Sequence, residues 1–575
     1  MERSRMHGAG LLTGAVLLMG GGPVAAQTPL PIPDTLNGAT IDLSLQEGTW
    51  SFRPGQPVPT YGYNGDVLGP TIMLEAGQPV TLNVTNLMPD LTTTHWHGLH
   101  VSPQNDGGPH SLIYPDSTWS PSFTVLDKAG TYWYHPHGHG FTDYQVTRGA
   151  AGMIIIRDAE EQALPLPRTY GVDDLPLILQ TKPVVAGEIM LHTGLDSVVV
   201  VNGVCDAAVM LPAQVVRLRC LNGSNERSLL IGLSNAMAMH VIGSDGGLLA
   251  APVPVDRLPL HPGERYEVLL DLNGMAGQTF DLMSYGSELP NGVMGSPDVS
   301  VAGTTPDGYT DNALNGGDFR FLRITVGPQT ADPVTAIPAT LAVVTPYAEA
   351  DADVTRTFVF APETMGPVGM VEGPYLINGA LYDMDVINEV VELGATEVWT
   401  LTNNTMVAHP FHIHDIQFHV LDRNGAPVPA HEQGRKDVVL VPPMGTVRVI
   451  TRFDDFADPD MPYMYHCHIL MHEDEGMMGQ FLVVDGSGVA DRKGDELLVW
   501  PNPAQEAITI RWGAAAGPSA ATLTDARGRT VLRQAIGRGG TAARVDVSTL
   551  APGPYVLTLT DQAGGRMARP VHITR

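Results

Sequence analysis

Apolar and polar residues alternate in short runs along most of the chain, and turns rich in glycine and proline separate these runs. Alternation with a period of two is typical of half-buried β-strands. Three of the runs share one template, in which a turn is followed by alternating residues and a final asparagine. They span residues 75–86, 211–222 and 392–403. The repeat predicts an all-β protein that contains three related β-sandwich domains.

The positions of the repeats predict the domain bounds. We expect the first sandwich at 36–158, the second at 164–328 and the third at 355–485. The polar, glycine-containing stretch 486–496 is typical of a flexible linker. Short alternating runs over 497–575 predict a further small β-sandwich, in which the sequence has no cysteine and no group of histidines.

The N-terminus has the composition of a secretory signal. Basic residues precede an apolar run from Leu11 to Met19, and small residues lead up to Gln27. We expect a signal peptide over residues 1–26, and an uncleaved membrane anchor is the alternative. No other stretch is apolar enough to span a bilayer. The mature protein is therefore expected to pass through the periplasm and to be secreted or held at the cell surface.

Charge and cysteine content narrow the classes of partner. The net charge of −29 argues against binding of nucleic acid or of an anionic membrane by charge, and it indicates a solvated acidic surface. The chain has three cysteines, and Cys467 lies within a group of histidines. Cys205 and Cys220 either form a disulfide, as an exported protein allows, or remain two buried thiols.

The stretch around Cys467 carries the most specific chemical signal. If it forms a strand, His466 and His468 point to one face and Cys467 to the other. Two further histidines and a methionine are spaced so that they can join the thiolate. A thiolate with two imidazoles and a weak axial thioether is the ligand set of an electron-transfer copper site. We therefore predict one copper ion held by His409, Cys467, His472 and Met477.

Eight other histidines form four pairs with one residue between the members. One pair begins nine residues after Asn86 and another nine residues after Asn403, so the first and third repeats are equivalent. Two such sandwiches facing each other would gather all four pairs, and eight imidazoles suit three metal ions. Thiolate and thioether ligands select copper, whereas a zinc site would need a second cysteine nearby. The eight are His95, His97, His135, His137, His412, His414, His466 and His468.

On these motifs, residues 36–485 resemble the three-domain multicopper oxidases, a family that includes laccases, bilirubin oxidases and bacterial cuprous oxidases. The resemblance implies cupredoxin-like Greek-key sandwiches, four copper ions and dioxygen as the oxidant. It implies that the copper beside Cys467 is a mononuclear blue copper and that the other three form a cluster. In that cluster it assigns the lone copper to His95 and His412, one copper of a coupled pair to His97, His135 and His468, and the other to His137, His414 and His466.

The resemblance also implies two acids that deliver protons to the cluster. They are Asp106, in the turn Asn105–Pro109, and Glu473, which directly follows His472. The alternative for each is an ordinary turn or surface carboxylate. Four histidines near the motifs match no ligand of the family and are expected to have structural roles. They are His100, His110, His139 and His419.

The function that the resemblance implies is that of a secreted laccase-like enzyme. It would oxidise phenolic or similar substrates by one electron at the blue copper and reduce dioxygen by four electrons to water at the cluster. The alternatives are a metallo-oxidase acting on Cu(I), Fe(II) or Mn(II) for metal tolerance, a non-catalytic exported copper-binding protein, and a two-domain nitrite reductase. The third domain weakens the last of these. A methionine-rich insertion would favour Cu(I), but Met365, Met370, Met384 and Met406 are too sparse to form one.

The end of the chain resembles the C-terminal sorting domain of the type IX secretion system. The matching features are Trp500-Pro-Asn-Pro503, Asp525 with Gly528, the stretch 550–556 and the terminal Arg575. This resemblance implies a secretion machinery as a partner. A generic adhesion or carbohydrate-binding sandwich is the alternative.

Overall fold

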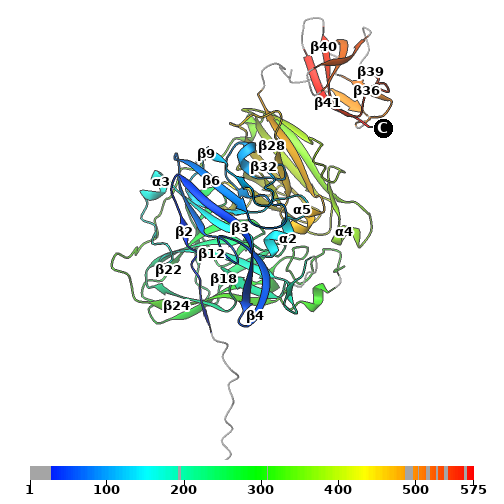
Figure 1. The fold of residues 1–575 in the computed structure, drawn as a ribbon. Coiled ribbons are helices and arrows are strands. Elements are labelled where there is room, and N and C mark those ends of the chain that lie inside the picture. The colour runs from blue at the N-terminus through cyan, green and yellow to red at the C-terminus, as the bar shows by residue number, and fades with distance from the viewer. Residues whose placement is uncertain are drawn as a thin grey trace, which may run out of the picture. The chain divides into compact units, whose positions relative to one another are not determined.

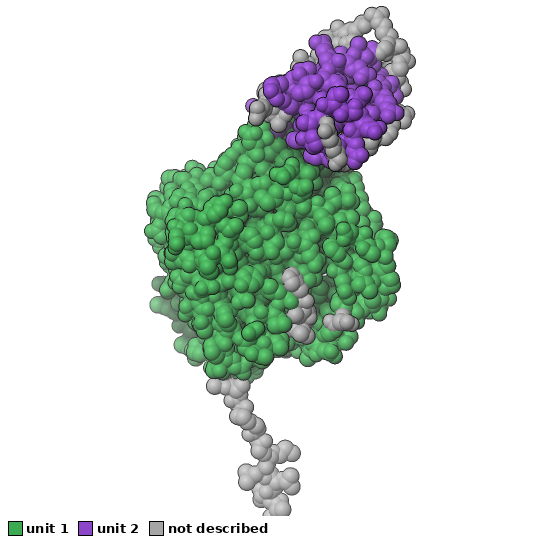
Figure 2. All heavy atoms as spheres, turned by 45° about the vertical axis from the view of Figure 1, so that its right-hand side comes forward, with its two compact units in different colours: residues 1–483 green, residues 484–575 purple. Residues whose placement is uncertain are grey.

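The computed structural model describes residues 27–485 apart from 192–195 and 307, and residues 497–574 apart from 501, 503, 513–517, 526–528, 537–541 and 562–565. The chain is nearly all β, as predicted (Figure 1). It divides into two compact units, residues 1–483 and 484–575, which Figure 2 draws in green and purple. The predicted signal peptide 1–26 and linker 486–496 lie outside the described residues.

The N-terminal part of the first unit contains two facing sheets. One has the order β2-β5-β11-β10-β7 and the other the order β4-β3-β6-β8, with β9 also paired to β6. Alternating residues of these strands, such as Ile41, Leu82 and Ile154, form one buried core between the sheets. The strands are β2 (Thr35–Leu36), β3 (Thr40–Arg53), β4 (Gln56–Tyr63), β5 (Thr71–Glu75), β6 (Pro79–Asn86), β7 (His95–His97), β8 (Thr118–Trp119), β9 (Ser122–Thr124), β10 (Gly130–His135) and β11 (Gly152–Arg157).

The middle part also contains two large sheets, with the orders β1-β16-β24-β23-β18-β21 and β15-β12-β17-β22-β19-β20. Its first strand comes from the N-terminal end of the described chain, because β1 (Thr28–Pro29) pairs in parallel with β16. A small hairpin joins β13 (Val184–Val185) to β14 (Glu188–Ile189). The remaining strands are β12 (Asp174–Lys182), β15 (Val198–Val201), β16 (Ala207–Pro212), β17 (Val215–Asn222), β18 (Leu229–Leu233), β19 (Met239–Ser244), β20 (Gly247–Val255), β21 (Leu258–Leu260), β22 (Arg265–Asp271), β23 (Thr279–Tyr285) and β24 (Asp318–Gly327).

The third part repeats the arrangement of the first. Its sheets have the orders β26-β25-β28-β32-β30 and β27-β34-β33-β29-β31. The strands are β25 (Val354–Pro362), β26 (Tyr375–Ile377), β27 (Glu389–Glu392), β28 (Thr396–Asn403), β29 (His409–Ile413), β30 (His419–Arg423), β31 (Val438–Val441), β32 (Thr446–Arg452), β33 (Tyr463–Cys467) and β34 (Met478–Val484).

The helices among the described residues are short and lie in the connections. Two of them, α2 and α5, pack against each other (Figure 1). The helices are α1 (Pro103–Asp106), α2 (Thr142–Thr147), α3 (Ala159–Gln162), α4 (Gly369–Glu372) and α5 (Leu470–Asp474). Single 3₁₀ turns are η1 (Gly286–Glu288), η2 (Tyr309–Asp311), η3 (Glu349–Asp351) and η4 (Ala430–Glu432).

The asparagine that ends each sequence repeat makes the same hydrogen bonds in all three parts. The side-chain amides of Asn86, Asn222 and Asn403 each donate to a backbone carbonyl in the loop that follows, at 2.8, 2.8 and 2.7 Å. Each side-chain oxygen accepts the backbone N–H two residues later. A buried amide with every group paired fixes the start of the loop. The sequence repeat is thus also a repeat of hydrogen bonds.

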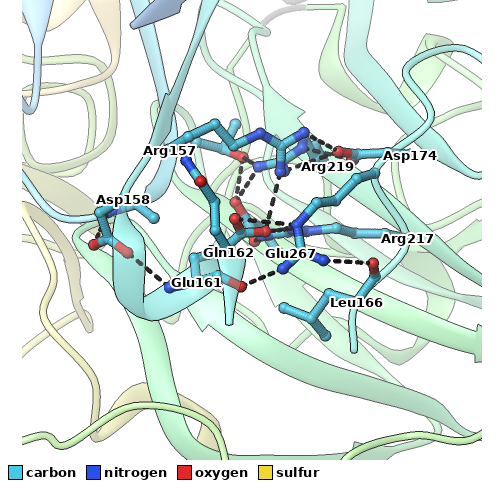
Figure 3. A network of polar contacts seen from close by, with 12 residues as sticks. Arg157, Asp158, Glu161, Gln162, Leu166, Asp174, Arg217, Arg219 and Glu267 are labelled. Carbon is cyan, nitrogen blue, oxygen red and sulfur yellow. Dashed lines mark hydrogen bonds and ion pairs between the residues drawn. The ribbon is translucent and has the colours of Figure 1, made fainter. Parts of the chain in front are cut away.

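A buried network of charges joins the first part to the middle part (Figure 3). Asp174 accepts from Arg157 and Arg219, each at 2.7 Å, and Glu267 bonds to Arg217 and Arg219. Burial alone would raise the pKa of Glu267, but the two guanidinium groups hold it at about 2. Charges out of water need such pairing, so the network sets how the two sheet pairs meet.

The second unit is a small β-sandwich with its own core, as predicted. A three-stranded sheet, β35-β36-β39, faces a four-stranded sheet, β38-β37-β40-β41, and residues such as Ile508, Leu523 and Leu557 are buried between them. Pro501, Pro503, Gly528 and Arg575 of the sorting motif lie outside the described residues. The strands are β35 (Leu498–Trp500), β36 (Ala507–Arg511), β37 (Pro518–Asp525), β38 (Thr530–Ala535), β39 (Ala542–Asp546), β40 (Gly553–Asp561) and β41 (Arg566–Ile573).

The fold resolves the state of the two cysteines that the sequence left open. Cys205 and Cys220 are both buried and both free, and they belong to different apolar clusters. Among the described residues, none of the helices has the length and apolar character that crossing a bilayer requires.

Candidate metal centre

Cys467, at the end of β33, lies in a compact group of metal-binding atoms. Its Sγ is 3.6 Å from Nδ1 of His409 at the start of β29 and 3.6 Å from Nδ1 of His472 on α5. Met477 is fully buried, and its backbone carbonyl accepts the N–H of Cys467 at 3.1 Å. The ring of Tyr375 lies 4.7 Å from both imidazoles and covers the group. The four residues predicted to hold the mononuclear copper therefore lie close together in the fold. The ligand atoms of three of them, His409, Cys467 and His472, are close enough to one another to hold one metal ion.

The other face of β33 turns towards the eight paired histidines. Their strands pair in equivalent registers, with His95 opposite His135 in the first part and His412 opposite His466 in the third. All eight side chains are at most 1% exposed. Ring nitrogens lie within 4.8 Å of one another in His97, His135 and His468, in His137, His414 and His466, and in His95, His412 and His414. The first two groups are the triads expected from the sequence, and His95 and His412 fall together as expected.

Hydrogen bonds determine which nitrogen each imidazole presents to the centre. In six of the eight, Nδ1 faces an oxygen, for example a backbone carbonyl 2.9 Å from His95 and one 2.8 Å from His412. These rings therefore present Nε2. His97 is reversed, because its Nε2 lies 3.1 Å from Oδ1 of Asp437 and its Nδ1 faces the centre. Nδ1 of His468 has no partner.

The ring nitrogens of the eight paired histidines are arranged as ligands of metal ions. Nε2 of His95 and of His412 is buried without a hydrogen-bond partner. Nε2 of His137 lies 3.0 Å from Nε2 of His466, and two neutral imidazoles protonated at Nδ1 would present facing lone pairs there. Burial lowers the pKa of six of the eight well below 6.5, so these rings are neutral donors at pH 7. A cation between the nitrogens would remove the repulsion.

The thiol site has the same character. Burial lowers the pKa of His472 to about 3 and raises the pKa of the Cys467 thiol. The imidazoles are therefore neutral at pH 7, whereas the thiol holds its proton until a metal ion displaces it. Soft sulfur beside imidazole nitrogen favours copper.

The two predicted acids are buried against histidines of the centre, so neither is a surface carboxylate. Oδ2 of Asp106 lies 2.8 Å from Nδ1 of His414, and its other oxygen has no hydrogen-bond partner. Glu473, on α5, lies 3.5 Å from Nδ1 of His137 and 3.2 Å from Nδ1 of His466. Burial would raise the pKa of Glu473, but its contacts with His137 and His466 and a hydrogen bond from Thr142 lower it.

The four other histidines near the motifs lie outside the three groups. His100 pairs with Asp415 at 2.8 Å, and His110 bonds to Gln480 at 2.8 Å. His139 stacks edge-on against Tyr382, and His419 is buried beside Tyr347. Their contacts are those of structural side chains.

Sequence reasoning missed Thr405 and Asp437, which contact histidines of the centre, and Arg265, which binds Asp437. Thr405 places its hydroxyl 2.8 Å from Nε2 of His409. Asp437 contacts His97, and Arg265 binds Asp437 through two bonds of 2.6 Å. A search for polar residues flanking strands β28, β31 and β22 would have found all three as candidates, but nothing in their spacing marks them as partners of histidines.

The comparisons with known proteins agree with this geometry. Sequence families described as multicopper oxidase match residues 44–161, 191–296 and 346–487, and a secretion system C-terminal sorting domain matches residues 498–571. A multicopper oxidase from Staphylococcus epidermidis is 32% identical over 77% of this chain and 88% of its own length. The cell division protein FtsP of Edwardsiella tarda is 33% identical over 82% of this chain and 97% of its own length.

A solved structure shows the same relationship in three dimensions. The laccase-like multicopper oxidase CueO from the lignin-degrading bacterium Ochrobactrum sp. has 36% identity, a TM-score of 0.70, and coverage of 79% of this chain and all of its own. It is described as having oxidase activity towards lignin model compounds and lignosulfonate. A secretion system C-terminal sorting domain follows the oxidase part of the chain. The chain belongs to the multicopper oxidases, which are copper-binding oxidoreductases.

Proposed function

We propose that the chain is a secreted laccase-like oxidase, which couples one-electron oxidation of phenolic or similar substrates to reduction of dioxygen to water. The observation that carries the proposal is strand β33. It presents Cys467 to one group of ligand atoms and His466 to the other, His468 directly follows it and joins the second group, and all three side chains are buried. A protein that only stored copper would not need two different sites joined by one strand.

The residues present fit four copper ions, which would supply the one-electron redox chemistry that amino acid side chains lack. We assign the mononuclear site to His409, Cys467, His472 and Met477. We assign the three-copper site to the eight paired histidines in the groups given by the sequence. The peptide bonds on either side of Cys467 provide a short covalent path between the two sites.

The chain also has groups suited to proton delivery. Reduction of one dioxygen to two waters takes up four electrons and four protons, and an imidazole whose ring nitrogen holds a metal ion cannot carry a proton on that nitrogen. Asp106 and Glu473 contact different histidines of the centre and come from opposite ends of the oxidase part. We assign to them the holding and transfer of protons, with the bond-free oxygen of Asp106 as the atom that faces the reaction.

Copper loading of the full chain tests the proposal. The loaded protein is expected to be blue and to consume dioxygen when a phenolic dye is added, and Cys467→Ser is expected to abolish both properties. A loaded wild-type chain that is blue but consumes no dioxygen with any reductant would contradict it.

A metallo-oxidase acting on Cu(I) is the second candidate, and one surface feature favours it. The backbone N–H of Met406 donates to the carbonyl of Met370, and that of Met444 donates to the carbonyl of Thr405, beside His409. The fold thus brings the backbones of three methionines that are scattered in the sequence to neighbouring loops, and Met444 is 58% exposed. Thioethers prefer Cu(I). Faster oxygen uptake with Cu(I) than with phenols, lost in Met406→Leu, would favour this candidate.

A non-catalytic copper-binding role is the remaining candidate, and the observation in its favour is the similarity to the cell division protein FtsP. The buried carboxylates Asp106 and Glu473 beside the histidines support an enzyme instead, since sequestration has no use for groups that transfer protons.

We further propose that residues 497–575 direct the chain through the type IX secretion system to the surface or the medium. We retain the predicted bounds 36–158, 164–328 and 355–485 for the oxidase domains.

A further inference from the structure

Among its described residues, the middle part of the chain supplies no histidine to the centre, yet it reaches the centre through Arg265. This side chain, at the start of β22, is fully buried. Two of its N–H groups donate to the two carboxylate oxygens of Asp437, each at 2.6 Å. Its three other N–H groups donate to the backbone carbonyls of Thr131, Asp245 and Gly263. All five donors are used, so the guanidinium has one orientation.

Asp437 passes this orientation on to two histidines from different parts of the chain. Its Oδ1 lies 3.1 Å from Nε2 of His97, and its backbone carbonyl lies 2.8 Å from Nδ1 of His412. The two rings stack with centroids 3.8 Å apart and planes 9° from parallel. One carboxylate residue therefore fixes a ligand from each of the two sandwiches that form the centre.

The packing around these groups leaves no room for another arrangement. Gly98, which follows His97, has φ +87°, and a Cβ there would meet the carboxylate of Asp437 and come within 2.6 Å of Nη2 of Arg265. Gly263, whose carbonyl binds Arg265, has φ +82°, and a Cβ there would come within 2.9 Å of Nε2 of His468. Glycine at both positions lets the middle part approach the histidines closely.

The tautomer of His97 follows from this contact. A carboxylate only accepts hydrogen bonds when it is ionised and paired with an arginine, so Nε2 of His97 carries the proton and Nδ1 carries the lone pair. His97 is the one member of the eight that presents Nδ1 in this way. If the carboxylate of Asp437 were free to turn, the proton of His97 could move to Nδ1. The lone pair would then lie on Nε2, which points away from His135 and His468.

We propose that Arg265 is a positioning residue of the copper cluster: through Asp437 it fixes the ring orientation of His97 and His412, so that the ligand-free middle part controls whether the cluster fills. The inference rests on the copper assignment proposed above and adds a residue to it. It concerns cluster assembly, and the site at Cys467 lies beyond its reach.

The test compares Arg265→Met with a matched control, Arg219→Met, after copper loading of the full chain. Both arginines are buried on neighbouring strands of the middle part, but Arg219 bonds to Asp174, Glu267 and Thr131 and touches no histidine of the centre. The measurements are copper per chain, the visible absorption of the thiolate site, and the electron paramagnetic resonance (EPR) spectrum. Arg265→Met is expected to stay blue, to bind two copper ions fewer than wild type, and to change the EPR signal of the cluster. Arg219→Met is expected to melt at a lower temperature and to keep its copper content and EPR spectrum.

A second variant protects the test against misfolding of Arg265→Met. Asp437→Asn keeps the side-chain volume and the backbone carbonyl for His412, but it removes the carboxylate from His97. It is expected to lower copper content and alter the cluster EPR signal while the blue absorption persists. Full copper content with an unchanged EPR signal in either variant would overturn the proposal. A wild-type chain that fills both sites but oxidises no substrate would contradict the proposed function alone.

Discussion

The carboxylate of Asp106 lies 2.8 Å from Nδ1 of His414, although 308 residues separate them in the sequence. Asp106 ends helix α1 in the first sandwich, and His414 follows β29 in the third. The contact therefore crosses the interface that the paired histidines occupy. It gives the centre a buried carboxylate whose second oxygen makes no hydrogen bond and lies 3.4 Å from Nδ1 of His95.

Asp106→Asn should slow turnover and leave the blue absorption in place. The amide keeps the size of the side chain but cannot release a proton, and loss of a general acid typically costs about 10²–10⁴ in rate. Oxygen uptake with a phenolic dye should fall at least about tenfold. Equal loss of turnover and of blue absorption would show instead that Asp106 holds the site together.

Glu267→Leu should destabilise the protein without emptying the copper sites. The change leaves Arg217 and Arg219 buried without one of their shared carboxylates (Figure 3). Removing one partner of a buried ion pair costs roughly 3–5 kcal/mol. Thermal unfolding should begin several degrees lower, while copper content after loading at low temperature equals that of wild type. An unchanged melting temperature would mean that the network contributes nothing net.

The copper-free protein should lose stability as the pH falls below about 6.5, the ordinary pKa of histidine. Burial lowers the pKa of His472 and of His261 to about 3, so the unfolded chain binds protons that the folded chain refuses. The stabilisation is complete above pH 6.5 and is lost as the pH falls towards 3. Each such histidine contributes about 1.4 kcal/mol per pH unit.

Melting of the copper-free protein from pH 8 to pH 4 measures this effect. The melting temperature should be nearly constant above pH 6.5 and should fall steeply below it. Copper loading should reduce the fall, because bound metal competes with protons for the same nitrogens. A melting temperature independent of pH between 6.5 and 4 would contradict the neutral state of the buried imidazoles.

Truncation after Asp485 should separate export from oxidation. The second unit has its own core, and none of the histidines of the centre lies in it. The shortened chain, expressed in the cytoplasm of a host without the secretion system and loaded with copper, should oxidise a phenol at the full rate. In a host that has the secretion system, it should no longer reach the medium. Normal secretion of the truncated chain would contradict the sorting role.

Part of the candidate site can be predicted from the sequence because it depends on local spacing. On β33 the alternation of His466, Cys467 and His468 fixes which face each side chain takes, and no tertiary contact is needed to know it. The repeat of Asn86 and Asn403 then aligns the other pairs. The sandwiches and the four histidine pairs follow from such local spacings, whereas the grouping of the pairs and the places of Asp106 and Glu473 are what the resemblance to the family implies.

What could not be predicted depends on contacts between distant segments. Arg265 and Asp437 are 172 residues apart, and neither lies at a periodic spacing from a histidine. The pairing of β1 with β16 takes the N-terminal strand into the middle part, against the order of the chain. Met370, Met406 and Met444 are far apart in sequence, and backbone bonds from Met406 to Met370 and from Met444 to Thr405 place their loops side by side. Such contacts are set by how the sandwiches pack, and no local pattern records them.

The central claim is that one strand joins a thiolate copper site to a three-copper cluster. Copper content, visible absorption and oxygen uptake, measured together on the loaded full chain with a phenolic reductant, test it most directly. We predict four copper ions per chain, a blue colour that Cys467→Ser removes, and one dioxygen consumed for every four electrons taken from the phenol. A fully loaded chain that remains colourless and consumes no dioxygen would contradict it.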